Sequence, residues 1–221
     1  AFGGYSDRFV IDQDYAVTVP DNLPLEGAAP LFCAGITLYS PIKHWKVGPG
    51  TKVAVMGLGG LGHMGVKFAK ALGAHVTVLS HSPAKESDAL AMGADAFVAT
   101  NDVSVFKDHA RTFDLILNTI SAEIDINQYL SLLALDGTLV VIGLPGKPYA
   151  VQVGTLLGAR RSMSGSMIGG MTELQEMIDF CGKHNIVSDV EVIKADYVNT
   201  AYERTVASDV KYRFVIDAAT I

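Results

Sequence analysis

Three glycines that follow a short apolar run have the spacing of a phosphate-binding loop. Gly57, Gly59 and Gly62 lie in the sequence GLGGLG, which matches G-x-G-x-x-G. In this pattern the first glycine permits a tight turn, the second lets the backbone approach a pyrophosphate, and the third lets a helix pack closely on a strand. The N–H groups at the start of the following helix attract the anion. The pattern predicts a dinucleotide site with contacts from Gly57, Leu58, Gly59, Gly60, Leu61 and Gly62.

A second polar group, Ser80-His81-Ser82 with Lys85, follows the next apolar run and bears on the kind of dinucleotide. An NAD site usually has a carboxylate here, which binds the ribose 2′-hydroxyl. No carboxylate appears before Glu86, and hydroxyl, imidazole and ammonium groups suit a 2′-phosphate, which a carboxylate would repel. The sequence therefore favours NADP over NAD. The alternative is a polar turn at Ser82-Pro83 that only caps a helix.

Three further segments would reach the same crevice, because ligands of parallel sheets bind outside the carboxyl ends of the strands. These segments are Asn118-Thr119, Gly143-Leu144-Pro145 and Ser166-Met167-Ile168. The pattern alone leaves open whether each one is a ligand contact or a turn.

The elements that would position these residues alternate between strand and helix. Apolar runs predict six strands: Val53–Met56, Val76–Leu79, Ala96–Ala99, Asp114–Asn118, Thr138–Ile142 and Met163–Ile168. Helical spacing predicts the connections between them, including helices over Leu61–Leu72, Ala84–Met92, Val103–Ala110 and Asn127–Leu135. This alternation predicts an α/β fold with a doubly wound parallel six-stranded Rossmann sheet.

The two ends of the chain do not continue this repeat. We expect two strands at Arg8–Ile11 and Ala16–Val19, and a helix over Pro24–Tyr39 that is interrupted near Gly35. The last part of the chain is expected to form a helix, a strand, a second helix and a second strand: Thr172–Lys183, Val190–Ile193, Asn199–Ala207 and Arg213–Ile216. We expect this tail to join the N-terminal segment in one β-rich unit.

Composition narrows the function classes. The net charge of −6, without a basic cluster, argues against nucleic acid and anionic membranes as partners. No apolar run approaches the ~20 residues of a membrane span, and the N-terminus lacks the features of a secretory signal. Two cysteines cannot form a disulfide framework, which indicates a reducing cytoplasm. The chain begins at Ala1 rather than methionine, so it is either processed or a piece of a longer chain.

Candidate metal ligands are few. Cys33 lies in an apolar segment, where it is either a small core residue or a ligand, and Cys181 is expected in the core. The six histidines make no recognised zinc spacing with one another or with a cysteine, and His63 and His184 are expected to be surface or packing residues. The sequence contains no G-x-S-x-G nucleophile elbow and no G-x-x-x-x-G-K-[ST] loop.

Three segments carry a resemblance that extends over the whole chain: LFCAGITLYSP at Leu31–Pro41, GLGGLGHMGVKFAK from Gly57, and KYRFVID from Lys211. The sequence resembles zinc-dependent medium-chain alcohol dehydrogenases, and within them the NADP-dependent cinnamyl alcohol dehydrogenases and their bacterial aldehyde-reductase relatives. The resemblance implies a dinucleotide domain and a β-rich, GroES-like catalytic domain. It divides the chain into a catalytic-domain remnant (1–34), an NADP-binding domain (35–170) and a segment that returns to the catalytic domain (171–221).

The resemblance also implies roles for individual residues. Cys33 matches a ligand of the catalytic zinc, Thr37 a residue beside the nicotinamide, and Arg213 an arginine near the pyrophosphate. The remaining matches are the pyrophosphate loop at Gly57–Gly62, a 2′-phosphate site at Ser80, His81, Ser82 and Lys85, and further cofactor contacts at Thr119, Gly143, Ser166, Met167 and Ile168. His81 departs from the threonine, serine or arginine that is commoner in the family.

By the family pattern, the other zinc ligands and the proton-relay residues precede Ala1. A catalytic zinc needs three protein ligands, as in alcohol dehydrogenases, so the isolated chain is expected to be inactive. The parent protein would transfer hydride between NADP(H) and a primary alcohol or aldehyde and form a homodimer through the last strand of its sheet. Two alternatives remain: a non-catalytic NADP-binding sensor or interaction module, and a zinc-free quinone-reductase relative. Cys33 argues against both.

Overall fold

The structure, a computed structural model, describes residues 4–221 and shows two compact units. One unit contains the residues up to Ile36 together with Gly169–Ile221, and the other contains Thr37–Ile168. No helix within residues 4–221 combines the length and the apolar character needed to cross a lipid bilayer.

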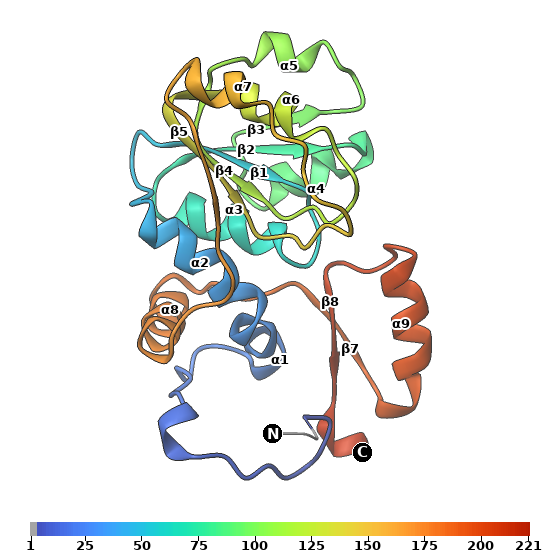
Figure 1. Cartoon of the computed structure of the whole chain (residues 1–221). Coiled ribbons are helices and arrows are strands. Elements are labelled where there is room, and N and C mark those ends of the chain that lie inside the picture. The colour runs from blue at the N-terminus through green and yellow to red at the C-terminus, as the bar shows by residue number, and fades with distance from the viewer. Residues whose placement is uncertain (1–3) are drawn as a thin grey trace. The chain divides into compact units, whose positions relative to one another are not determined.

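The unit Thr37–Ile168 is built on one parallel sheet in the order β3-β2-β1-β4-β5-β6 (Figure 1). Its strands are β1 (Lys52–Met56), β2 (His75–Ser80), β3 (Ala96–Ala99), β4 (Phe113–Asn118), β5 (Leu133–Val141) and β6 (Ser162–Gly165). This order is the one in which two three-stranded halves meet between β1 and β4, and it confirms the predicted Rossmann sheet.

Helices cover both faces of this sheet, as Figure 1 shows. The connections are α2 (Ala34–His44, which begins in the other unit), α3 (Gly62–Ala71), the 3₁₀ turn η3 (Pro83–Lys85), α4 (Glu86–Ala91), α5 (Val105–Asp108), α6 (Ile126–Ser131) and α7 (Val153–Leu157). The central strands are buried on both sides, which explains why they read as continuous apolar runs rather than as alternating ones.

Successive residues of each strand serve opposite faces. On one face, Met56 and Ile116 join a core with Phe106 of α5 and Tyr129 of α6, whose rings meet edge to face at 5.0 Å. On the other face, Gly65 of α3 allows close packing against Val55 and against Leu38 of α2. Packing on both faces of the sheet therefore fixes the positions of the carboxyl ends of its strands.

The region before β5 differs from the prediction. The helix expected over Asn127–Leu135 ends at Ser131, and β5 begins at Leu133. Leu133 pairs with Phe113, after which the register shifts and Asp136 takes a positive φ of 63°. A buried leucine suits a strand as well as a helix, so apolar spacing alone placed this boundary wrongly. The short helix α7 was not predicted, and β6 ends at Gly165 rather than at Ile168.

The other unit contains a long helix and a small parallel sheet. Its elements are η1 (Gln13–Tyr15), α1 (Leu25–Ala28), η2 (Ala29–Phe32), α8 (Met171–His184), β7 (Val190–Ile193), η4 (Ala195–Tyr197), α9 (Val198–Val206), β8 (Arg213–Ile216) and η5 (Ala218–Thr220). Strands β7 and β8 pair in parallel, and α9 connects them. Arg204 of α9 binds Glu191 of β7 and stacks over the Phe214 ring at 4.8 Å.

The strands expected at Arg8–Ile11 and Ala16–Val19 are absent from the structure, because no described strand pairs with them. The backbone of Thr18 forms hydrogen bonds with the amide side chain of Gln175 instead of with a partner strand. The Gln175 amide accepts from the Thr18 N–H at 2.8 Å and donates to the Thr18 carbonyl at 3.0 Å.

The interruption expected near Gly35 occurs at Cys33, whose backbone leaves the helical region. Gly35 itself lies inside α2. A Cβ there would approach the Met177 sulfur of α8 at 3.2 Å, so this glycine serves close helix packing rather than a break.

Candidate functional site: the carboxyl edge of the parallel sheet

The register of the sheet brings the predicted contact segments to one edge. One row of paired residues crosses five strands: Leu79, Met56, Asn118, Val141 and Gly165. The residues that come next in the chain are Ser80, Gly57, Thr119, Ile142 and Ser166. Backbone bonds continue across the sheet here, from Gly57 N to Leu79 O at 2.8 Å and from Thr119 N to Met56 O at 3.2 Å. This edge includes the point between β1 and β4 where the strand order reverses.

The three glycines of the loop after β1 have three different surroundings. Gly57 has a φ of +85°, which L side chains rarely adopt. A Cβ on Gly62, the first residue of α3, would overlap the carbonyl oxygen of Gly57. By contrast, nothing lies within 4 Å of a Cβ position on Gly59. Two glycines thus shape the turn, and the third leaves open space in which a phosphate group could approach the backbone.

Thr119 and Gly143 complete the edge on the β4 and β5 side. The Thr119 hydroxyl donates to Met56 O at 2.7 Å and lies 3.4 Å from Gly57 O, which ties the end of β4 to the loop. A Cβ on Gly143 would overlap the backbone of Ile120, so only glycine fits between the ends of these strands. Both residues hold the backbone at this edge of the sheet in place.

Asn118, in a segment that the sequence placed at this edge, has a buried side chain that holds the ends of the neighbouring strands together. Its side chain is fully buried, accepts from the Ile120 N–H at 3.0 Å and donates to the Tyr149 hydroxyl at 3.1 Å. Its carbonyl accepts from the N–H groups of Ile142 and Gly143, both at 2.9 Å. Only the position of Asn118 at a predicted strand end could have pointed to it.

The polar residues Ser80, His81 and Ser82 lie between the end of β2 and the start of η3, and Lys85 ends η3. Ser80 is buried, and its hydroxyl accepts from the Ser82 N–H at 3.3 Å. Ser82 precedes η3, yet its own side chain makes no capping hydrogen bond. His81 is exposed, and Lys85 donates from Nζ to Leu58 O at 2.8 Å, which brings it to the glycine loop. Ser82 and Pro83 thus occupy the N-cap and the first position of η3, as in the capping alternative, but without a side-chain capping bond.

His63 lies at the start of α3 and is fully buried, as expected for a packing residue. Its Nδ1 is 3.1 Å from Gly59 O, and because a carbonyl only accepts, Nδ1 carries the proton. The spacing of four residues from Gly59 is the sequence signal for this contact.

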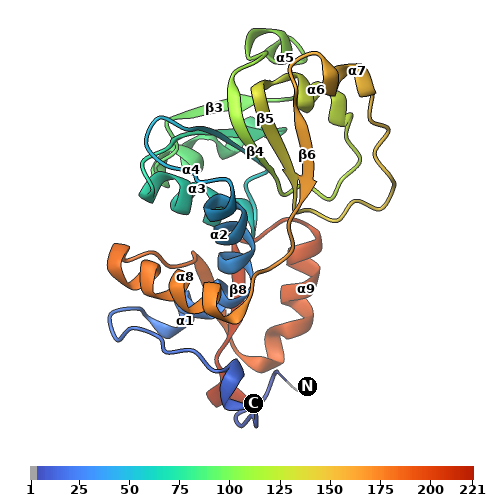
Figure 2. The same cartoon turned by 60° about the vertical axis from the view of Figure 1, so that its left-hand side comes forward.

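The remaining cofactor candidates lie at the margins. Met167 and Ile168 follow the edge strand β6 (Figure 2) and are exposed, and Ile168 has a φ of +50°. Thr37, the fourth residue of α2, is buried, and no described contact joins it to the glycine loop.

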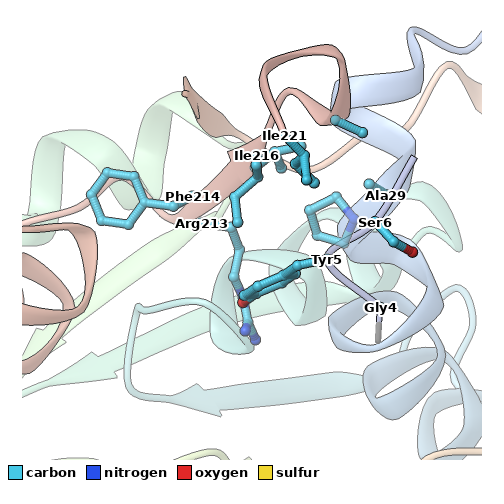
Figure 3. Close-up of a pocket in the computed structure, with 11 residues that line it drawn as sticks. Gly4, Tyr5, Ser6, Ala29, Arg213, Phe214, Ile216 and Ile221 are labelled. Carbon is cyan, nitrogen blue, oxygen red and sulfur yellow. The ribbon is translucent and has the colours of Figure 1, made fainter. Parts of the chain in front are cut away.

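Cys33 and Arg213 belong to the other unit. Arg213 lines a cavity of about 300 Å³ there, where its side chain runs beside the Tyr5 ring, with Ile216 and Ile221 nearby (Figure 3). Cys33 is exposed, whereas Cys181 is buried, and burial raises the pKa of the Cys181 thiol to about 12.

A zinc ion does not fit the ligands that the described part of the chain supplies. Within residues 4–221, no three histidine, cysteine, aspartate or glutamate side chains gather in a group that could hold a metal ion. Cys33 is the one zinc ligand that the family resemblance implied for this chain. A single thiolate cannot form the three-ligand set of a catalytic zinc.

The strand order and the glycine loop at its reversal point define a Rossmann-type unit, the fold class of dinucleotide-binding domains. A sequence model of zinc-binding dehydrogenases matches residues 60–183, which is more than half of the chain. The chain belongs to this zinc-binding dehydrogenase family.

Individual relatives agree with this assignment. The chain is 58% identical over 219 residues to NADP-dependent alcohol dehydrogenase C 1 of Mycolicibacterium smegmatis, covering 99% of this chain and 63% of that protein. It is 53% identical to cinnamyl alcohol dehydrogenase 8 of Arabidopsis thaliana, covering 99% and 61%. The chain therefore spans less than two thirds of the length of these relatives.

Solved structures show the same fold. A cinnamyl alcohol dehydrogenase from Sorghum bicolor has a TM-score of 0.92 at 47% identity, covering 95% of this chain and 60% of that one. CAD from Helicobacter pylori, solved in a complex with NADP(H), has a TM-score of 0.86 at 42% identity, with the same coverage.

Proposed function

We propose that this chain binds NADP(H) at the carboxyl edge of its parallel sheet and belongs to an alcohol dehydrogenase or aldehyde reductase. The observation that carries the proposal is the open position of Gly59 between two sterically constrained glycines, at the point where the strand order reverses. Two relatives support the choice of cofactor, since one is named NADP-dependent and one was solved with NADP(H).

In this proposal the loop Gly57–Gly62 and the N-terminus of α3 bind the pyrophosphate. The 2′-phosphate is bound by the hydroxyls of Ser80 and Ser82, together with His81 and Lys85. The segment from Ser80 to Lys85 contains no carboxylate that could repel this phosphate. Thr119, Gly143 and Ser166–Ile168 border the nicotinamide half, and Thr37 and Arg213 complete the set as further contacts. When bound, the cofactor supplies or accepts a hydride.

We further propose that the unit containing Cys33 and Arg213 is part of a catalytic domain and that the substrate is a primary alcohol or aldehyde, of the cinnamyl type or similar. The described chain contributes Cys33 as a single ligand, so we expect no alcohol oxidation by the chain alone. The two free cysteines fit a reducing compartment such as the cytoplasm. Two copies would pair through the edge strand β6, which has a neighbour on one side.

The test is a paired titration of the 221-residue chain with NADPH and NADH, followed by nicotinamide fluorescence. We expect tighter binding of NADPH than of NADH and no alcohol-dependent reduction of NADP. Equal affinities would overturn the assignment of the 2′-phosphate site. Failure of both cofactors to bind would overturn the proposed function of this chain.

A further inference from the structure

Lys85 reaches back from the turn after β2 to the glycine loop after β1. Its Nζ donates to the carbonyl oxygen of Leu58 at 2.8 Å, across 27 residues of sequence. The Leu58 side chain is buried, so this part of the loop is anchored on both its side chain and its carbonyl. The contact is an ammonium–carbonyl hydrogen bond, which is stronger than a neutral one.

This contact fixes the direction of a neighbouring N–H group. In a trans peptide, the carbonyl of one residue and the N–H of the next point in opposite directions. When Lys85 holds Leu58 O, the Gly59 N–H must point away from Lys85. His63 acts on the next peptide, because both its backbone N–H and its Nδ1 lie 3.1 Å from Gly59 O. Two successive peptides of the loop are thereby oriented by residues outside the loop.

Gly59 is also a position of the loop with open space beside the backbone. Nothing lies within 4 Å of its Cβ position, and it is the second glycine of the pattern, where the backbone approaches a pyrophosphate. The peptide that Lys85 orients therefore carries an N–H group at the position where the pattern brings the backbone close to a pyrophosphate.

We propose that Lys85 is a positioning residue that couples the 2′-phosphate site to the pyrophosphate loop, an inference that rests on the proposed function. An ammonium has three N–H donors, so one can remain on Leu58 O while the others turn to a 2′-phosphate. A bound 2′-phosphate holds the ammonium at this place, and the ammonium holds the Leu58–Gly59 peptide. Lys85 thus acts on the pyrophosphate loop, which both NADP and NAD would contact, as well as on the 2′-phosphate site, which distinguishes the two cofactors.

This coupling differs measurably from a simple phosphate contact. A lysine that only binds the 2′-phosphate would affect NADPH and leave NADH binding unchanged. A lysine that also orients the loop must affect both cofactors, and it must affect the loop when no cofactor is present.

The experiment compares Lys85→Met, Lys85→Arg and Lys107→Met with the unaltered chain. Lys107 is an exposed residue of α5, so its variant controls for the loss of one positive charge. We expect Lys85→Met to weaken NADPH binding by about 10- to 100-fold, as for a lost charged hydrogen bond, and NADH binding by about 3- to 10-fold. Lys85→Arg keeps the charge and the donors and should restore part of both affinities.

The second measurement needs no cofactor. In the free chain, the Gly59 amide resonance should shift in Lys85→Met and remain in place in Lys107→Met. The inference is overturned if Lys85→Met leaves both the NADH affinity and the Gly59 resonance unchanged while NADPH binding weakens. That result would retain the proposed function, whereas an unaltered chain that binds neither cofactor would remove it.

Discussion

The first residue of α3, Gly62, faces the carbonyl oxygen of Gly57 so closely that any side chain on Gly62 would overlap that oxygen. The two residues close the turn between β1 and α3, and Gly59 lies between them with open space around it. Glycine at position 62 thus permits the turn to close, and Gly59 leaves room for a ligand.

Alanine at these two positions should therefore have different effects. Gly62→Ala adds a methyl group where the backbone is already in contact, so we expect it to destabilise the chain by about 1–3 kcal/mol. Gly59→Ala meets no protein atom and should leave the melting temperature within about 1–2 °C. It should nevertheless weaken NADPH binding, because the methyl group occupies the space that a phosphate would approach.

Thermal melting and NADPH titration of both variants separate these effects, with the unaltered chain as the reference. Equal melting temperatures for Gly62→Ala and Gly59→Ala would contradict the structure of the turn. Unchanged NADPH affinity in Gly59→Ala would contradict the placement of the pyrophosphate.

A negative charge at Ser80 should reverse the cofactor preference. Ser80 ends β2 and bonds to the Ser82 N–H, so Ser80→Asp places a carboxylate where the 2′-phosphate is proposed to bind. Like-charge repulsion should weaken NADPH binding by at least about tenfold relative to NADH. Ser80→Asn, which has the same shape without the charge, is the matched control. If NADPH and NADH retain their relative affinities in Ser80→Asp, the phosphate lies elsewhere.

The hydrogen bond between Asn118 and Tyr149 should contribute to stability. Tyr149→Phe removes the hydroxyl to which the buried Asn118 amide donates at 3.1 Å. A buried donor that loses its partner costs about 1–3 kcal/mol, so the urea midpoint should fall. Tyr15→Phe removes a hydroxyl from an exposed ring and should change the midpoint little. Identical midpoints for the two variants would show that this bond does not support the strand ends.

Asp95 should make stability depend on pH in the acid range. A hydrogen bond from Lys70, followed by one from the Val76 N–H, lowers the pKa of the Asp95 carboxyl. A carboxyl whose pKa is lower in the folded state stabilises the fold above its unfolded value of about 3.9, and this stabilisation is lost as pH falls through the folded value. Asp95→Asn should therefore cost about 1 kcal/mol near pH 7, because both bonds are partly exposed to water.

Urea unfolding at several pH values measures this difference. The gap in unfolding free energy between the unaltered chain and Asp95→Asn should be constant down to about pH 4 and should shrink below it. Asp21→Asn, at an exposed position, provides the comparison. A gap that stays constant or widens in acid would contradict the role given to the Lys70–Asp95 pair.

Much of the Rossmann unit could be predicted from the sequence, because buried parallel strands leave an apolar run that turn residues bound on both sides. Strand β3 was predicted at its observed bounds, Ala96–Ala99, and so were β7 and β8 in the other unit. The prediction of two N-terminal strands was wrong because their apolar runs did not reveal whether a partner strand exists. An extended segment becomes a strand only when another strand pairs with it, and the residues of Ala16–Val19 carry no information about that partner.

The backbone of the candidate site could be predicted better than its side chains. Glycine spacing located the loop because the positive φ of Gly57 and the contact of Gly62 with Gly57 O both require glycine, while Gly59 leaves space beside the backbone. The contacts of Lys85 with Leu58 and of His63 with Gly59 depend on side-chain direction and on chain crossings, which sequence spacing does not specify. The same holds for Asn118, whose four hydrogen bonds appear only when β4, β5 and Tyr149 come together.

The most direct test of the central claim is amide chemical-shift mapping of the 221-residue chain as NADPH is added. We predict that the largest changes fall on Gly57–Gly62, on Ser80–Lys85 and on the residues that follow Asn118 and Val141. Changes confined to the cavity around Tyr5 and Ile216, or changes that NADH reproduces at the same concentrations over Ser80–Lys85, would contradict the proposed NADP site.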